Sequence, residues 1–171
     1  MEIQKQEVWN QARVYLISKC NTRKALKMMN KKCLVLSRKN NKKMRISIKF
    51  TNFDKTADIK LNNSRSPKTV KAILNALPLQ VKINRWGDEL YTDKTPIVAE
   101  EENARSVVDL LDVAYWPEGY SPCLFYGPTP ISKSPDEILA YSPVNIVGKI
   151  ISKNNILNHI KHNTIVTISK E

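Results

Sequence analysis

Hydrophobic and polar side chains alternate in short runs along the last two thirds of the chain. In residues 44–50, Ile46, Ile48 and Phe50 alternate with charged or polar residues. A period of two indicates a β-strand that buries one of its faces. The same alternation, interrupted by short turns, predicts further strands over residues 57–61, 79–83, 89–92, 96–99, 111–116, 123–126, 144–150 and 164–168.

Two segments have helical rather than strand spacing. The first begins at Ser66 and Pro67, residue types suited to an N-cap and to the first helical position, and it ends before Pro78. The second is a short helix over residues 156–160. About eight strands and two helices predict a mainly β fold, a closed antiparallel barrel whose ends the helices cap. By propensity alone, a β-sandwich fits the pattern nearly as well.

Residues 128–143 interrupt the strand pattern and form its longest irregular stretch. The sequence predicts a loop there. Loops of this length in a compact domain are usually functional or mobile, which makes this segment a candidate for a functional role.

The first 43 residues differ from the rest in charge. They carry 12 Lys and Arg against 2 Glu, whereas residues 44–171 carry 16 basic and 14 acidic residues, so most of the net charge of +12 lies in residues 1–43. Helical spacing without Gly or Pro predicts a basic N-terminal extension, helical or partly disordered. Because Met44 stands directly before the first strand, a mis-assigned translation start is the alternative. A basic arm with Trp9 and Tyr15 suggests non-specific nucleic-acid binding through residues 1–43.

The composition favours a soluble, cytoplasmic protein without a membrane partner. Hydrophobic residues make up 42% of the chain, but no run approaches the about 18 apolar residues of a membrane span. Cys20, Cys33 and Cys123 have no Cys-x-x-Cys spacing, and the N-terminus lacks the layout of a secretory signal. His159 and His162 have no third ligand nearby in the sequence, so we expect neither a metal site nor a cofactor.

Several motifs in residues 44–171 resemble those of one family. They are Asn84-x-Trp86-Gly87-Asp88-Glu89-x-Tyr91, Ala114-Tyr115-Trp116-Pro117-x-Gly119, Cys123-Leu124-Phe125-x-Gly127-x-Thr129-Pro130 and Val144-Asn145-x-Val147-Gly148-Lys149. Together they look like the small prokaryotic cyclophilin-like family over nearly all of residues 44–171. The resemblance implies a cyclophilin-type barrel and no settled biochemical function. Residues 1–43 are not part of this pattern.

The resemblance also suggests one catalytic candidate. In cyclophilins an Arg polarises the prolyl amide, so that its C–N bond rotates more easily. Arg85 is the residue placed to imitate it, and its alternative role is an ion pair with Asp88 or Glu89. The pocket His, Trp and Gln residues of cyclophilins have no counterpart here, which limits the isomerase prediction to a weak activity.

Aromatic residues supply the candidate ligand groove. The groove candidates are Trp86, Tyr91, Tyr115, Trp116 and Phe125. Strand alternation places Tyr91, Tyr115 and Phe125 toward the interior, and turns beside the two tryptophans leave those as the stronger groove candidates. We interpret the acidic clusters at residues 88–89 and 100–102 as solvated loop charges.

The sequence therefore favours a binding module that holds a peptide or small ligand in a groove beside the barrel, without catalysis. A weak peptidyl-prolyl isomerase is the first alternative. Nucleic-acid binding through residues 1–43 is the second.

Overall fold

The structure is a computed structural model of the 171-residue chain, and it describes residues 44–51, 55–152 and 156–171. The chain divides into two units, Met1–Lys42 and Lys43–Glu171. The predicted basic extension over residues 1–43 lies outside the described residues. Every strand of the described residues belongs to the second unit.

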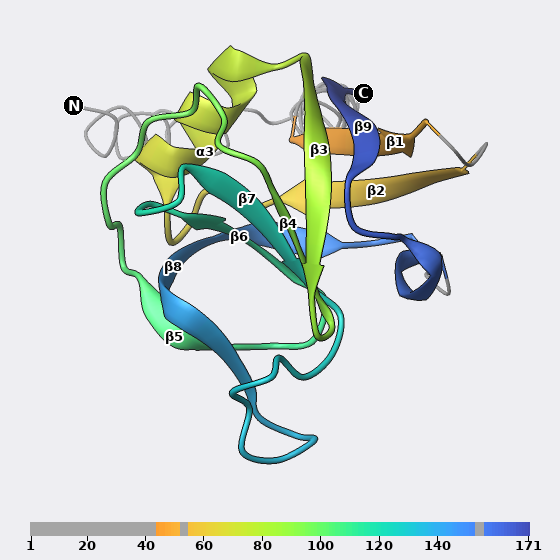
Figure 1. The fold of residues 1–171 in the computed structure, drawn as a ribbon. Coiled ribbons are helices and arrows are strands. Elements are labelled where there is room, and N and C mark those ends of the chain that lie inside the picture. The colour runs from red at the N-terminus through yellow and green to blue at the C-terminus, as the bar shows by residue number, and fades with distance from the viewer. Residues whose placement is uncertain (1–43, 52–54, 153–155) are drawn as a thin grey trace, which may run out of the picture. The chain divides into compact units, whose positions relative to one another are not determined.

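The described residues form nine strands and one α-helix (Figure 1). The elements are β1 (Arg45–Phe50), β2 (Lys55–Leu61), α3 (Pro67–Ala76), β3 (Leu79–Trp86), β4 (Glu89–Thr92), β5 (Arg105–Val108), β6 (Asp112–Trp116), β7 (Ser121–Phe125), β8 (Ile138–Ile150), the 3-10 turn η1 (Leu157–His159) and β9 (Thr164–Lys170). Eight strands follow the order β2-β1-β9-β3-β4-β7-β6-β8, and pairing of β2 with β8 closes them into a barrel. The predicted closed antiparallel barrel is confirmed.

The barrel interior is filled by one face of each strand. Ile48, Ile83, Leu90 and Leu124 are among its fully buried side chains. An internal cavity of about 20 Å³ in this core holds at most a single water molecule. The interior is therefore packed, and a larger ligand needs a site elsewhere.

The helix α3 covers one end of the barrel, but its N-terminus is capped by a residue far away in sequence. The predicted cap, Ser66, makes no capping hydrogen bond with its side chain and instead donates to the backbone oxygen of Glu102 at 3.1 Å. The Glu102 carboxylate accepts hydrogen bonds from the backbone N–H of Thr69 at 2.9 Å and of Lys68 at 3.1 Å. Although burial acts to raise its pKa, these bonds hold the pKa of Glu102 below its ordinary 4.5. Fully buried Asn145 accepts a hydrogen bond from the Glu102 N–H at 2.8 Å and so ties this cap to β8.

Removing this cap is expected to destabilise the protein modestly. Glu102→Ala should lower the free energy of unfolding by about 1 kcal/mol, the usual effect of losing a helix cap, when measured by urea denaturation at neutral pH. Exposed Glu101, the preceding residue, offers the matched control, because Glu101→Ala removes the same charge but none of the capping hydrogen bonds. Equal losses in the two variants would contradict the capping role.

Three details of the sequence prediction are wrong. Residues 96–99 form no strand, although Ile97 is buried. The Ile97 N–H donates a hydrogen bond to the Thr95 hydroxyl, and its carbonyl oxygen accepts one from the Tyr115 hydroxyl. Neither backbone group of Ile97 therefore pairs with a neighbouring strand. The extra strand lies instead at Arg105–Val108, outside the barrel order. The predicted second capping helix is only the three-residue turn Leu157–His159.

The segment 128–143, predicted as a loop, is irregular only in its first part. Strand β8 begins at Ile138, and its first half pairs with β5 while its second half pairs with β6. Both ladders contain a register shift, and such bulges bend a strand. Figure 1 shows this bend, with β5 beside the first half of β8.

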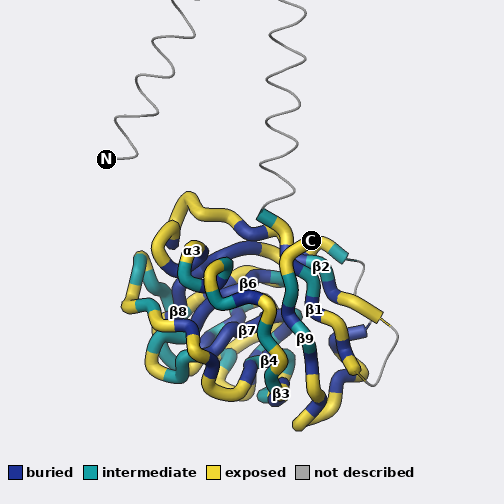
Figure 2. Tube along the Cα trace, turned by 90° about the horizontal axis from the view of Figure 1, so that it is seen from above, coloured by how far each residue is buried: buried dark blue, intermediate teal, exposed yellow. Residues whose placement is uncertain are grey.

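The bend in β8 covers part of the outer surface of the barrel. All five residues of β7 are buried, so the strand is covered on both faces. In Figure 2 buried positions run along β6 and β7. A second hydrophobic cluster fills this outer layer and includes Ala114, Cys123, Phe125, Ile138 and Ile146.

The helix α3 has ten residues, and no helix in the described ranges is long and apolar enough to cross a membrane.

Candidate functional site

A pocket of about 230 Å³ lies on the outer face of the barrel, at the edge of the second hydrophobic cluster. Four aromatic side chains, one carboxylate, one hydroxyl and two small apolar groups form its walls. These residues are Trp86, Glu89, Tyr91, Trp116, Ala140, Tyr141, Ser142 and Val144. They come from β3, β4, β6 and β8.

Strand alternation and register explain why these side chains meet. On β4, Glu89 and Tyr91 point to the side opposite Leu90, which is buried in the barrel core. Pairing places Glu89 between Trp86 of β3 and Phe125 of β7. A row across three strands therefore carries aromatic, acidic and aromatic side chains on the same outer face.

Glu89 is the chemically unusual residue of the pocket. It is only 7% exposed, and burial raises the pKa of its carboxyl from an ordinary 4.5 to about 7, although a hydrogen bond with the Cys123 thiol partly offsets this. Among the ion pairs of the described residues, none involves Glu89. Its carboxyl thus changes charge near neutral pH inside an aromatic pocket.

Cys123 supplies a neutral neighbour to this carboxyl. The thiol is fully buried, and burial together with the nearby Glu89 charge raises its pKa well above 9.0. Its sulfur also lies 3.7 Å from the backbone oxygen of Ser121. Cys123 therefore remains a protonated thiol at neutral pH and provides no positive charge for Glu89.

The aromatic rings form a cage at the outer side of the pocket. Tyr141 is 72% exposed, and its ring meets those of Trp86 and Trp116 edge to face, with centroids 6.2 and 6.3 Å away. The Trp116 indole N–H donates to the Ser142 hydroxyl at 2.7 Å, which fixes the orientation of the indole. The backbone of Gly119 lies against the same ring, where a Cβ atom would overlap it.

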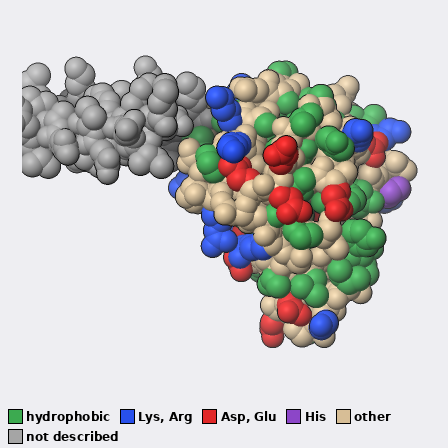
Figure 3. All heavy atoms as spheres, turned by 90° about the vertical axis from the view of Figure 1, so that its left-hand side faces the viewer, with side chains coloured by type: hydrophobic (Ala, Val, Ile, Leu, Met, Phe, Trp, Pro, Cys, Tyr) green, Lys and Arg blue, Asp and Glu red, His purple; other side chains and the backbone are tan. Residues whose placement is uncertain are grey.

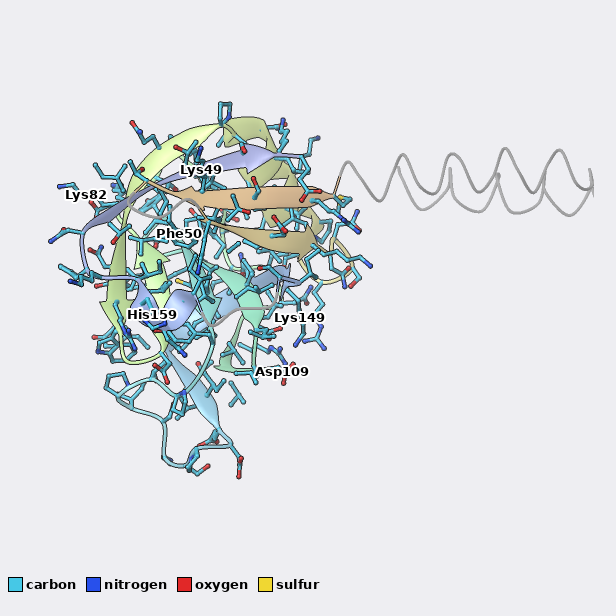
Figure 4. The ribbon with its side chains drawn as sticks, turned by 90° about the vertical axis from the view of Figure 1, so that its right-hand side faces the viewer. Lys49, Phe50, Lys82, Asp109, Lys149 and His159 are labelled. Atoms are coloured by element: carbon cyan, nitrogen blue, oxygen red, sulfur yellow. The ribbon has the colours of Figure 1, made fainter. Side chains whose placement is uncertain are left out.

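Ion pairs fasten the β5 side of this outer layer to the barrel. Asp112, only 1% exposed, lies 2.7 Å from the Arg105 guanidinium and 3.2 Å from the Lys149 amine. Arg105 also pairs with Asp109 at 3.0 Å, and this hydrogen bond holds the pKa of Asp109 below its ordinary 3.8. Figure 4 shows Asp109 and Lys149 on the same side of the domain, away from His159. The cluster holds together β5, β6 and β8, the strands around the second hydrophobic cluster.

Hydrophobic groups are also exposed near this outer layer. Val107 of β5 and Leu110 after it are exposed, as is Tyr141. Figure 3 shows hydrophobic side chains gathered over the lower part of this side of the domain.

The aromatic residues predicted for the groove divide into two groups. Trp86, Tyr91 and Trp116 line the pocket. Tyr115 lies in the barrel core and donates its hydroxyl to the Ile97 carbonyl at 2.6 Å, and Phe125 is buried in the outer cluster. Neither Tyr115 nor Phe125 is a wall residue.

Arg85, the predicted catalytic candidate, is engaged by its own neighbourhood. Its guanidinium donates to the backbone oxygens of Gly87 at 2.9 Å and Asn158 at 2.8 Å, and it pairs with Asp88 at 3.2 Å. It also lies over the Tyr126 ring, 5.7 Å from the centroid. Arg85 therefore links the β3–β4 turn to η1 and is not one of the pocket residues.

The sequence analysis does not predict five of the wall residues, namely Glu89, Ala140, Tyr141, Ser142 and Val144. The interpretation of Glu89 as a solvated loop charge is wrong, because it is the buried first residue of β4. Its position two residues before Tyr91 is a signal that it shares a strand face with that groove candidate, although this position does not indicate its burial. Tyr141 and Ser142 belong to the segment predicted as a loop, so no strand pattern places them.

In the described part of the chain, no group of three or more His, Cys, Asp or Glu residues is arranged to hold a metal ion.

Comparison with known proteins places this fold in a family. The model of the Cyclophilin-like family matches residues 44–169. The chain belongs to this family. The family resemblance seen in the sequence is thus confirmed, and the match includes every wall residue of the pocket.

Two solved structures are similar to this Cyclophilin-like chain. A hypothetical protein from Archaeoglobus fulgidus has 38% sequence identity and a TM-score of 0.65, and the match covers 77% of this chain and 97% of that one. McbB, solved in complex with tryptophan, has 16% identity and a TM-score of 0.58, and the match covers 74% of this chain but only 44% of McbB. The second likeness shows the fold alone. A search of curated proteins finds no match.

Proposed function

We propose that this protein is a binding module whose outer pocket holds a small molecule with a flat aromatic group. The observation that carries the proposal is the cavity of about 230 Å³ walled by Trp86, Tyr91, Trp116 and Tyr141. Concave sites lined mainly by aromatic and apolar side chains with a few polar groups are typical ligand pockets.

The size and construction of the pocket favour a small ligand over a peptide. Typical pockets for drug-sized ligands occupy about 300–1,000 Å³, so this one suits a compact molecule of one or two rings. Trp116 is held from two sides, by the Ser142 hydroxyl and by the Gly119 backbone. A pre-oriented ring loses less conformational freedom on binding, which favours affinity.

Prolyl isomerisation receives less support than ligand binding. It requires a free cationic group facing the peptide, whereas the Arg85 guanidinium already donates to two carbonyl oxygens and a carboxylate. The pocket walls contain no Lys, Arg or His that could replace it.

Binding can be tested with naphthylmethanol, a neutral aromatic probe, by titration into the full chain with NMR and calorimetric detection. Gly119→Ala should weaken binding about tenfold, equivalent to about 1.4 kcal/mol, because the new Cβ forces the Trp116 ring out of place. Val98→Ala removes an apolar side chain that is 72% exposed and not part of the pocket, and it should leave the affinity unchanged. Absence of binding to the folded wild-type protein, or equal effects of both substitutions, would reject the proposal.

A further inference from the structure

We propose that the pocket selects ligands that carry a protonated amine, with Glu89 as the counter-ion and the surrounding aromatic rings as a cage. This inference rests on the proposed ligand-binding function and specifies the chemical class of its ligand.

The carboxylate of Glu89 has no cationic partner among the described residues. Glu89 lines the pocket at 7% exposure, and no ion pair of the described residues includes it. Its hydrogen-bond partner, the Cys123 thiol, is neutral. A buried carboxylate without a cation is costly, and a ligand ammonium group in the pocket supplies the missing positive charge.

The aromatic cage around the pocket also favours a cationic ligand. Cations are attracted to the faces of Trp and Tyr rings, and desolvated sites strengthen this attraction. The pocket walls contain two Trp and two Tyr residues, and Tyr141 contacts both tryptophans. Rings around a single carboxylate favour an ammonium group carried on an aromatic or apolar body.

The pocket walls carry no positively charged side chain that could attract an anion. Glu89 is the charged residue of the walls, and Glu118 adds a second carboxylate near the rim through a hydrogen bond from Ser142 at 3.1 Å. A carboxylate or phosphate ligand would therefore meet like charges.

The protonation of Glu89 makes the selectivity depend on pH. The titratable groups that face it are the Cys123 thiol of β7, whose pKa is raised by burial, and the phenols of Tyr91 on β4 and Tyr141 on β8. Glu89, whose pKa is about 7, is largely ionised at about pH 8 and only about 3% ionised at about pH 5.5. If the ionised form alone attracts the amine, affinity should fall about thirtyfold between these values, because the competent fraction falls by that factor.

The experiment compares three naphthalene probes of similar shape on the full chain: naphthylmethylamine, naphthylmethanol and naphthoate. At about pH 8 the amine should bind at least about tenfold more tightly than the alcohol, and naphthoate more weakly than both. Glu89→Gln should lose most of this preference, and only the smaller contribution of the aromatic rings should remain. Asp136→Asn, which removes an exposed carboxylate that is not part of the pocket, should retain the preference for the amine.

Each outcome decides a separate point. Equal binding of the amine and the alcohol to wild-type protein, or an amine preference that Glu89→Gln does not reduce, overturns the amine inference and leaves the ligand-binding function intact. No binding of any probe to folded protein rejects the proposed function itself. If Glu89→Gln does not fold, the wild-type protein alone tests the amine inference. Its ratio of amine to alcohol affinity must fall between about pH 8 and pH 5.5, and a constant ratio overturns the inference.

Discussion

Gly148→Val is expected to lower the free energy of unfolding by about 3 kcal/mol or more, as overpacking at a tightly packed position does. Gly148 lies in β8 opposite Leu61 of β2, at the pairing that closes the barrel. A Cβ atom at Gly148 would overlap the Lys60 carbonyl oxygen and lie 3.0 Å from the Leu61 Cα atom. Both groups are backbone, so they cannot move without separating β2 from β8.

Urea denaturation of three variants tests this role of Gly148. Gly148→Ala should cause a smaller loss than Gly148→Val, because it adds fewer atoms at the same contact. Lys60→Val places the same β-branched side chain on an exposed position of the same β2–β8 pairing. It should change the stability by less than about 0.5 kcal/mol. Equal stabilities of Gly148→Val and wild type would mean that β2 and β8 can move apart at no cost, which would contradict the role assigned to Gly148.

The barrel could be predicted from the sequence because four of its eight strands, β1, β2, β3 and β9, alternate between a buried and a more exposed face. In β1, for example, Ile46, Ile48 and Phe50 fill the core while their neighbours face outward, and the alternation is visible in the sequence. The strand predictions fail where the chain does not alternate between buried and exposed residues. The short strand Arg105–Val108 pairs only with the bent start of β8, a tertiary arrangement that leaves no local signal.

The candidate site was less predictable than the barrel because it, too, depends on contacts between segments far apart in the sequence. Trp86 and Trp116 stand beside turns, which made them groove candidates in the sequence, and both line the pocket. Burial of Glu89 depends on β8 folding back over the outer sheet, and nothing near Glu89 in the sequence indicates that cover. Tyr141 belongs to the strand that makes the cover, so its role depends on the same long-range contact.

Glu89→Gln is expected to stabilise the protein by about 3 kcal/mol at about pH 8, the free energy that corresponds to a pKa of about 7 in place of 4.5. The folded protein binds the Glu89 proton more tightly than the unfolded chain does. Its stability therefore falls as the pH rises from about 4.5 to about 7, and the full loss is present above that window. Below about pH 4.5 both states carry the proton, so the variant should gain nothing there.

Urea denaturation of Glu89→Gln and wild type across this pH range measures the difference directly. Asp136→Asn is the matched control, since it makes the same carboxylate-to-amide change at an exposed position that is not part of the pocket. A stability difference between Glu89→Gln and wild type that is the same at about pH 4 and pH 8 would show that Glu89 is not held in its neutral form by burial.

This destabilisation also connects stability to binding. Buried groups that weaken a fold are found mainly where function requires them, and an apolar residue at position 89 would pack without the penalty of a buried charge. If a ligand ammonium group pairs with Glu89, saturating naphthylmethylamine at about pH 8 should stabilise wild type more than Glu89→Gln and so narrow the gap between them. The same amine should narrow it less at about pH 5.5, because there the carboxyl of the unliganded protein already carries its proton.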